Sequence, residues 1–136
     1  GSCRVCMDAC PTQAIVAPRM VDSTLCISYH TIENRGDIPR EIQASSGDWL
    51  FGCDICQEVC PWNMKARVTD ELDFHARPGH AGMDLDTIED LTEDSFREEF
   101  SGTPVMRAKL KGLQRNARIV RRNTEHGKDG DTPNEP

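Results

Sequence analysis

Apolar residues recur at helical spacing in the last third of the chain. Intervals near three to four residues are the period of one face of an α-helix. Thr103–Pro104 places a capping residue before a proline at the first helical position. The pattern therefore predicts an amphipathic helix over 104–122, with its Lys and Arg side chains largely outward. Its apolar positions are Val105, Leu110, Leu113, Ala117 and Val120.

Shorter elements are predicted before this helix. Thr92 is a capping residue with Ser95 and Phe96 in the first turns that follow, which indicates a helix start. The short apolar piece 27–32 fits a strand or a turn, and the loop residues 36–39 lead into a helix at 40–44.

These patterns divide the chain into four parts. Residues 1–63 contain every cysteine, and their Pro, Gly and short apolar pieces indicate loops around short helices. We expect 64–83 to be a linker and 84–123 a helical segment with a basic face. The polar residues 124–136 are expected to be disordered.

Composition limits how this chain is stabilised. It has 136 residues, of which 37% are hydrophobic, with 8 Pro and 10 Gly, so a large apolar core is not expected. Its 7 cysteines are an odd number in short runs, which favours metal ligation over a disulfide framework. Without a long apolar window or a secretory start, we expect a cytoplasmic protein that does not bind membranes.

The net charge of −7 is unevenly distributed along the chain. Carboxylates dominate 84–99, and a run of basic residues without acids follows. Such a run is by default a solvated helix face, but clustered Lys and Arg also neutralise phosphates. The basic residues are Arg107, Lys109, Lys111, Arg115, Arg118, Arg121 and Arg122.

The cysteines form two copies of the run Cys-x2-Cys-x3-Cys-Pro. In two-cluster bacterial ferredoxins the full run is Cys-x2-Cys-x2-Cys-x3-Cys-Pro, and its fourth thiolate binds the other cluster. The first cysteine of the first run is expected just before Gly1. In the second run, Leu50 occupies the position of the first cysteine. Cys26 is the one cysteine that remains to replace it.

Exchange of the fourth ligands gives two sets of thiolates, which suit iron–sulfur clusters because sulfur is a soft ligand. We therefore predict two [4Fe–4S] clusters. The expected fold is α+β, mostly helix and loop. It consists of a ferredoxin-like double-cluster module followed by short helices that begin a helical-repeat region. One set is Cys3, Cys6 and Cys60 with the residue before Gly1, and the other is Cys10, Cys26, Cys53 and Cys56.

A zinc-stabilised binding module is an alternative for the same cysteines. Two Cys-x2-Cys pairs supply the four thiolates of one zinc site, which leaves three cysteines unexplained. The Cys-Pro endings are not required by zinc ribbons.

Several strings resemble those of epoxyqueuosine reductases, and they extend beyond the cysteine runs to about Asn123. They are CPTQAI at 10–15, CISYHTIE at 26–33, GCDICQEVCPWN at 52–63, GTPVMRA at 102–108 and GLQRNA at 112–117.

The resemblance implies a cobalamin-dependent oxidoreductase that reduces epoxyqueuosine to queuosine at the wobble position of tRNA. It also implies that the cobalamin domain and its acidic proton donor precede this chain, so we expect an electron-transfer part without catalytic residues of its own. The expected partners are tRNA and a ferredoxin- or flavodoxin-type electron donor, and the expected state is a monomer. The remaining alternative is a stand-alone ferredoxin-like carrier, or the iron–sulfur part of another oxidoreductase such as a reductive dehalogenase relative.

The resemblance also implies site residues. The cluster of Cys10, Cys26, Cys53 and Cys56 is expected to lie nearer to cobalamin. Ser28 and Asp54 either contact the corrin or serve locally, in hydrogen bonding of the cysteine sulfurs or as caps of turns. The basic residues expected to contact tRNA are Arg107, Lys109, Lys111, Arg115 and Arg118, although the helical repeats of the family do not follow them in this sequence.

Overall fold

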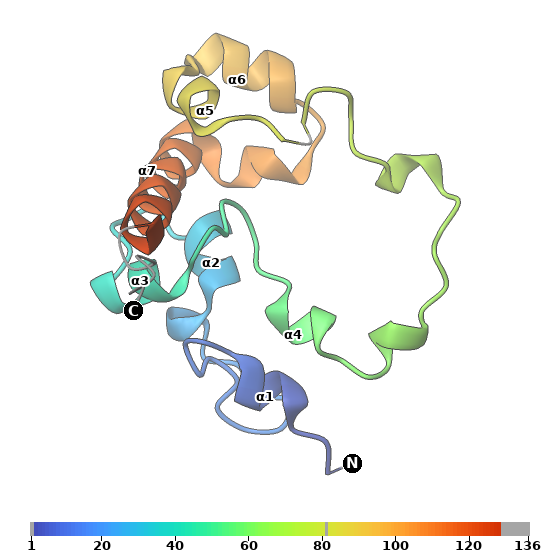
Figure 1. The fold of residues 1–136 in the computed structure, drawn as a ribbon. Helices are drawn as coiled ribbons and strands as arrows, with labels where there is room; N and C mark the ends of the chain where they lie inside the picture. The colour runs from blue at the N-terminus through green and yellow to red at the C-terminus, as the bar shows by residue number, and fades with distance from the viewer. Residues whose placement is uncertain (1, 81, 129–136) are drawn as a thin grey trace, which may run out of the picture.

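The computed structural model describes residues 2–80 and 82–128, and it consists of short helices and loops (Figure 1). Within these residues, β structure is limited to one isolated antiparallel bridge, between Ala17 and Met20. The predicted helix-and-loop character is confirmed, whereas the β part of the α+β prediction is reduced to this bridge. The α-helices are α1 Val5–Ala9, α2 Ile27–Ile32, α3 Arg40–Ser45, α4 Ile55–Glu58, α5 Leu85–Asp90, α6 Glu93–Phe100 and α7 Lys109–Lys128.

Helix α7 differs at both ends from the helix predicted over 104–122. Pro104–Arg107 form a separate 3₁₀ turn (η4), and α7 starts at Lys109, whose φ of 61° is left-handed and interrupts the helix. The Thr103 hydroxyl donates to the Phe100 carbonyl at 2.7 Å instead of capping.

The predicted disordered tail is wrong for 124–128, which continue α7, because each added residue of a long helix gains a backbone hydrogen bond. The rest of that tail, 129–136, lies outside the described residues. No described helix has the length and hydropathy needed to cross a membrane.

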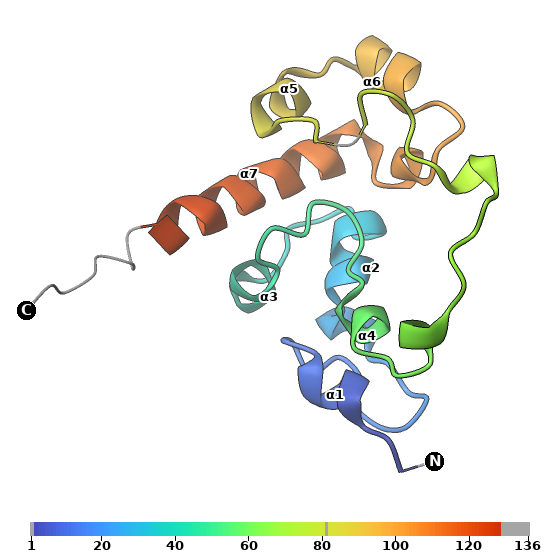
Figure 2. The same ribbon diagram turned by 45° about the vertical axis from the view of Figure 1, so that its right-hand side comes forward.

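Helix α7 joins two apolar clusters, which makes it the centre of the fold (Figure 2). The first is formed with α5 and α6 and contains Ile88, Phe96, Phe100, Leu110, Leu113 and Ala117. The second is formed with α2, α3 and the loop between them, and contains Ile27, Ile38, Ile42 and Ile119. Burial of Leu110, Leu113, Ala117 and Val120 confirms the predicted apolar face.

The predicted strand or turn at 27–32 is wrong, because these residues form α2. Ile27, His30 and Thr31 are its buried residues, at the spacing of one helical face. The Thr31 hydroxyl donates to the Ile27 carbonyl at 2.9 Å, a bond that suits a helix interior. The predicted helix at 40–44 is confirmed as α3.

Helices α5 and α6 both begin with a side-chain cap. The Thr92 hydroxyl accepts from the Ser95 N–H at 3.2 Å, and the Ser95 hydroxyl accepts from the Thr92 N–H at 2.9 Å, so the predicted helix start is confirmed as a capping box before α6. Asp84 caps α5, which sequence reasoning did not separate from α6.

An extended arm connects α4 to α5 and extends away from the helices, as the green arc in Figures 1 and 2 shows. It contains the 3₁₀ turns Asn63–Lys65 and Leu72–Phe74. The arm returns to the helical segment where Arg77 donates to the Ser101 carbonyl at 2.8 Å. Its exposed apolar side chains are Trp62, Met64, Val68, Leu72 and Phe74.

Candidate functional site

The two cysteine runs have the same local structure and lie together. The middle cysteine of each run, Cys6 or Cys56, is inside a short helix, α1 or α4. The third cysteine, Cys10 or Cys60, follows at the end of the helix, next to its proline. Helices α1 and α4 contact each other at the end of the molecule away from α5 and α6 (Figure 1).

Four cysteines surround one cavity of about 90 Å³. They come from four places in the chain, the end of α1, the start of α2, the loop before α4 and α4 itself. They are Cys10, Cys26, Cys53 and Cys56, the set that the spacing assigns to one cluster. The rest of the lining is mainly apolar, from Pro11, Ala14, Ile15, Val21, Ile27 and Ile55. Four thiols around a mainly apolar cavity fit the donor set of a [4Fe–4S] cluster.

Backbone geometry places Cys26 and Cys53 at this cavity. Cys26 is the N-cap of α2 and follows the 3₁₀ turn Ser23–Leu25. The His30 ring holds that turn, because Nε2 lies 2.8 Å from the Thr24 carbonyl oxygen, which can only accept. Gly52, just before Cys53, has a φ of 78°, which glycine adopts without a Cβ clash.

Cys10 is surrounded by hydrogen-bond donors. The Ala14 N–H donates to its sulfur at 3.3 Å, and the Thr12 hydroxyl oxygen lies 3.6 Å from the same atom. Burial by itself raises the pKa of this thiol, but the hydrogen bonds from Thr12 and from backbone N–H groups outweigh it and lower the pKa below its usual value. The site therefore favours sulfur in its thiolate form at Cys10.

Cys53 and Cys56 show the opposite shift. Burial raises the pKa of both thiols, and neighbouring cysteines, Cys26 and Cys10 among them, raise it further because thiolates repel one another. Several thiolates in this cavity would thus need positive charge to compensate them, which iron would supply.

The four cysteines are spread around the cavity rather than gathered at one point. Within 2–80 and 82–128, no three His, Cys, Asp or Glu side chains are close enough to share a single ion. In a four-iron cluster each thiolate binds a different iron, so its ligands surround a cavity. The four-cysteine cavity has this arrangement.

The other predicted set is less enclosed. Cys3 is exposed, whereas Cys6 and Cys60 are partly buried. Cys6 is near enough to Cys56 to raise the pKa of that thiol. Ligation of a second cluster by Cys3, Cys6 and Cys60 stays a prediction.

Ser28 and Asp54 both lie within two residues of a cavity cysteine. Ser28 is half-buried in the first turn of α2, after Cys26. Asp54 is exposed at the N-cap of α4, and its carboxylate makes no capping hydrogen bond there. The structure therefore offers no local capping role for Asp54, and contact of either residue with a corrin stays a prediction.

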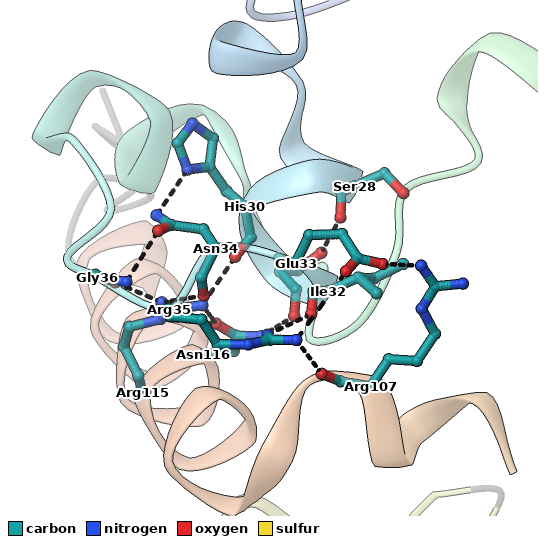
Figure 3. A network of polar contacts seen from close by, with 11 residues as sticks. Ser28, His30, Ile32, Glu33, Asn34, Arg35, Gly36, Arg107, Arg115 and Asn116 are labelled. Carbon is teal, nitrogen blue, oxygen red and sulfur yellow. Dashed lines mark hydrogen bonds and ion pairs between the residues drawn. The ribbon is translucent and has the colours of Figure 1, made fainter.

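Arg115 does not point outward as its place in the basic run predicts (Figure 3). Its guanidinium donates to the carbonyl oxygens of His30 at 2.7 Å, Asn34 at 2.9 Å and Gly36 at 2.5 Å. Burial, and then repulsion by Arg35, lower its pKa. These carbonyls lie at and beyond the end of α2, where the helix leaves them without helical partners. Arg115 thus serves the fold.

The other basic residues expected to contact tRNA are divided between ion pairs and solvent. Arg107 pairs with Glu33, and Arg118 lies 3.6 Å from Glu89. Lys109 and Lys111 are exposed.

A groove of about 770 Å³ lies between the loop after α2, α6 and the start of α7. Its basic lining residues are Arg35, Arg97, Lys109, Lys111, Arg115 and Arg118, and its acidic ones are Asp37 and Glu93. The sequence did not indicate Arg35 and Arg97 as part of this surface, because neither belongs to the basic run. Only the fold brings them beside that run.

Known proteins match this chain both within its cysteine-rich residues and beyond them. Residues 1–63 match the family model described as a 4Fe-4S double cluster binding domain. The epoxyqueuosine reductase of Atelocyanobacterium thalassa is 47% identical over 120 residues, which cover 87% of this chain and 39% of that protein. The one of Cellulophaga algicola is 47% identical over 116 residues, 85% of this chain and 38% of that protein.

Solved structures of epoxyqueuosine reductases are similar to this chain in both fold and sequence. A crystal structure of an epoxyqueuosine reductase with an epoxyqueuosine-modified tRNA stem loop has a TM-score of 0.84 and 33% identity, and covers 90% of this chain and 32% of that one. The epoxyqueuosine reductase from Bacillus subtilis has a TM-score of 0.86 and 32% identity, and covers 94% of this chain and 34% of that one. The chain therefore spans well under half the length of the relatives that it matches.

Proposed function

Because the chain is a member of the epoxyqueuosine reductase family over the part of those proteins that it spans, we propose that it is the electron-transfer part of such an enzyme. The whole enzyme would reduce epoxyqueuosine to queuosine at the wobble position of tRNA. The observation that carries the proposal is the cavity with Cys10, Cys26, Cys53 and Cys56.

The residues of the cavity have defined tasks in this proposal. A bound [4Fe–4S] cluster supplies one-electron transfer. The cysteines hold it, the apolar lining excludes water, and the donors around Cys10 adjust its potential. The overall change is balanced, because the epoxide takes up two electrons and two protons, loses its oxygen as water and leaves an alkene.

Cobalamin is the proposed acceptor cofactor, held mainly by residues beyond those of this chain. Ser28 and Asp54 are the proposed contacts from this side, supported by their positions beside Cys26 and Cys53. An external ferredoxin- or flavodoxin-type protein in the cytoplasm would donate the electrons.

The basic groove is the proposed tRNA surface. A structural neighbour is described with a tRNA stem loop, and exposed Lys and Arg side chains neutralise phosphates whatever the base sequence. Lys109, Lys111 and Arg118 line this groove, which supports their predicted role. Arg115 and Arg107 have protein partners and would shape the surface more than bind phosphate.

A stand-alone ferredoxin-like carrier has less support. The relatives match along 116 to 120 residues, and so well past the cluster-binding module that ends at residue 63. A carrier would need no such continuation into α7.

The proposal is tested by conversion of epoxyqueuosine-modified tRNA in the complete protein. We expect Cys53→Ala to abolish queuosine formation, measured by mass spectrometry of digested tRNA, while tRNA binding persists. Conversion at the unsubstituted rate would contradict the proposed role of the cavity.

A further inference from the structure

Three consecutive polar residues of α7 point into the fold, although the helix is otherwise basic on its outer side. Each one donates to at least two backbone carbonyls outside α7, so the run ties α7 to the α5 region, to α2 and the loop after it, and to the segment before Cys53. Gln114 binds the carbonyls of Glu89 and Leu91, Arg115 those of His30, Asn34 and Gly36, and Asn116 those of Thr31 and Leu50.

Asn116 is the most buried of the three, with 1% of its surface exposed. Its Nδ2 donates to the Thr31 carbonyl at 2.8 Å and to the Leu50 carbonyl at 3.0 Å. Its Oδ1 accepts from Nη2 of Arg115 at 2.9 Å and from Nε at 3.2 Å. Both ends of the amide are therefore satisfied, and a side chain bound in this way is fixed in orientation.

The two carbonyls held by Asn116 belong to the segments that carry Cys26 and Cys53. Thr31 lies in α2, of which Cys26 is the N-cap. Leu50 lies three residues before Cys53 and occupies the position where a ferredoxin run has its first cysteine. The Thr31 hydroxyl also accepts from the Gly52 N–H at 3.0 Å, which adds a second tie between the same segments.

Helix α2, after Cys26, is held by its buried residues Ile27, His30 and Thr31, but the elements on the other sides of the two cysteines are not buried in this way. The 3₁₀ turn before Cys26 and helix α4 after Cys53 contain no buried residue. Thiolates from separate segments must nevertheless keep fixed mutual positions to bind one cluster. The buried amide supplies a restraint that the short elements lack.

We propose that Asn116 is a positioning residue that fixes Cys26 relative to Cys53, and so sets the geometry of the cluster that these cysteines hold. The inference rests on the proposed cluster at this cavity. It assigns to α7, a helix that contains no cysteine, a role in the iron–sulfur site.

The test compares Asn116→Ala with Gln114→Ala in the complete protein reconstituted with iron and sulfide. Gln114 is the matched control, because its amide also donates to two backbone carbonyls from α7 but ties α7 to the α5 region. The readouts are the EPR spectrum of the reduced protein and the rate of iron loss to a chelator.

For Asn116→Ala we expect an altered EPR signal from one of the two clusters and about tenfold faster iron loss from that cluster. This is the lower end of the effect of losing a direct partner of a metal ligand, because Asn116 acts through the backbone and not on a cysteine itself. For Gln114→Ala we expect unchanged signals and rates. Equal effects of the two variants, or no effect of Asn116→Ala, would overturn the proposal. Absence of any cluster in the unsubstituted protein would instead overturn the proposed function.

Asn116→Asp covers the case in which the alanine variant does not fold. It keeps the size of the side chain and the contact with Arg115 but cannot donate to the Thr31 and Leu50 carbonyls. The same selective change of one cluster is expected, and an unchanged spectrum would contradict the proposal.

Discussion

The backbone N–H of Ala14 donates a hydrogen bond to the sulfur of Cys10 at 3.3 Å, and the Thr12 hydroxyl lies 3.6 Å from the same sulfur. Cys10 thus differs from Cys53 and Cys56, whose pKa values are raised mainly by burial. Hydrogen bonds to cluster sulfurs stabilise the more negative, reduced state and raise the potential.

The substitution Thr12→Val tests this contact. It removes the hydroxyl with little change of shape, so we expect the midpoint potential of one cluster to fall. The measurement is a redox titration followed by EPR. Thr87→Val, which removes a hydroxyl from the cap of α5, is the control and is expected to leave both potentials unchanged. A potential that stays constant or rises in Thr12→Val would contradict the assignment.

The left-handed backbone at Gly52 gives a second prediction. A Cβ added there meets no atom within 4 Å, so the cost of Gly52→Ala is backbone strain alone. We expect the free energy of unfolding to fall by about 1–2 kcal/mol, measured by urea denaturation. Gly112→Ala is the control, because Gly112 lies inside α7, and it is expected to stabilise by up to about 1 kcal/mol. Equal effects of the two substitutions would contradict the backbone argument.

The cap of α5 gives a pH dependence. The Asp84 carboxylate accepts from the Thr87 N–H at 2.8 Å and from its hydroxyl at 2.7 Å, and these bonds, the backbone one first, lower its pKa. Because the pKa is lower in the folded than in the unfolded chain, the stabilisation is complete above the unfolded pKa and is lost as the pH falls through the folded one.

We therefore expect Asp84→Ala to lower the melting temperature of the metal-free protein at neutral pH, with a difference that shrinks below about pH 4. Thermal unfolding between pH 7 and pH 3 measures it. Glu98→Ala, at an exposed position of α6, is the control and should change little at any pH. A difference between Asp84→Ala and the unsubstituted protein that is independent of pH would be inconsistent with capping by the carboxylate.

The basic groove predicts a salt-dependent interaction with tRNA. Lys111→Glu should weaken binding of an anticodon stem loop and reduce the slope of log affinity against log salt by about one for each phosphate that the variant no longer neutralises. Binding titrations at several salt concentrations measure both. Lys65→Glu, on the extended arm, is the control. An unchanged slope in Lys111→Glu would place the tRNA elsewhere.

Sequence reasoning succeeded where the information is local. Thr92 directly precedes the helix that it caps, so this helix start was predictable. The cavity set with Cys26 was also predictable, because ligand exchange between runs follows from spacing and the loss of a cysteine at Leu50 leaves one replacement.

The sequence did not predict features that depend on distant partners or on single backbone angles. The three carbonyls that turn Arg115 inward lie 79 to 85 residues earlier in the chain, and nothing in a basic run indicates them. The left-handed φ of Lys109, which splits the predicted helix, involves a residue type that ordinarily continues helices. The role of Asn116 likewise depends on the tertiary position of Leu50.

We propose above all that Cys10, Cys26, Cys53 and Cys56 hold one [4Fe–4S] cluster. The most direct test is iron and sulfide analysis with EPR of the complete reconstituted protein carrying Cys26→Ala. We expect loss of one four-iron cluster while the signal of the other persists. Two unaltered cluster signals in Cys26→Ala, or bound zinc without sulfide in the unsubstituted protein, would contradict it.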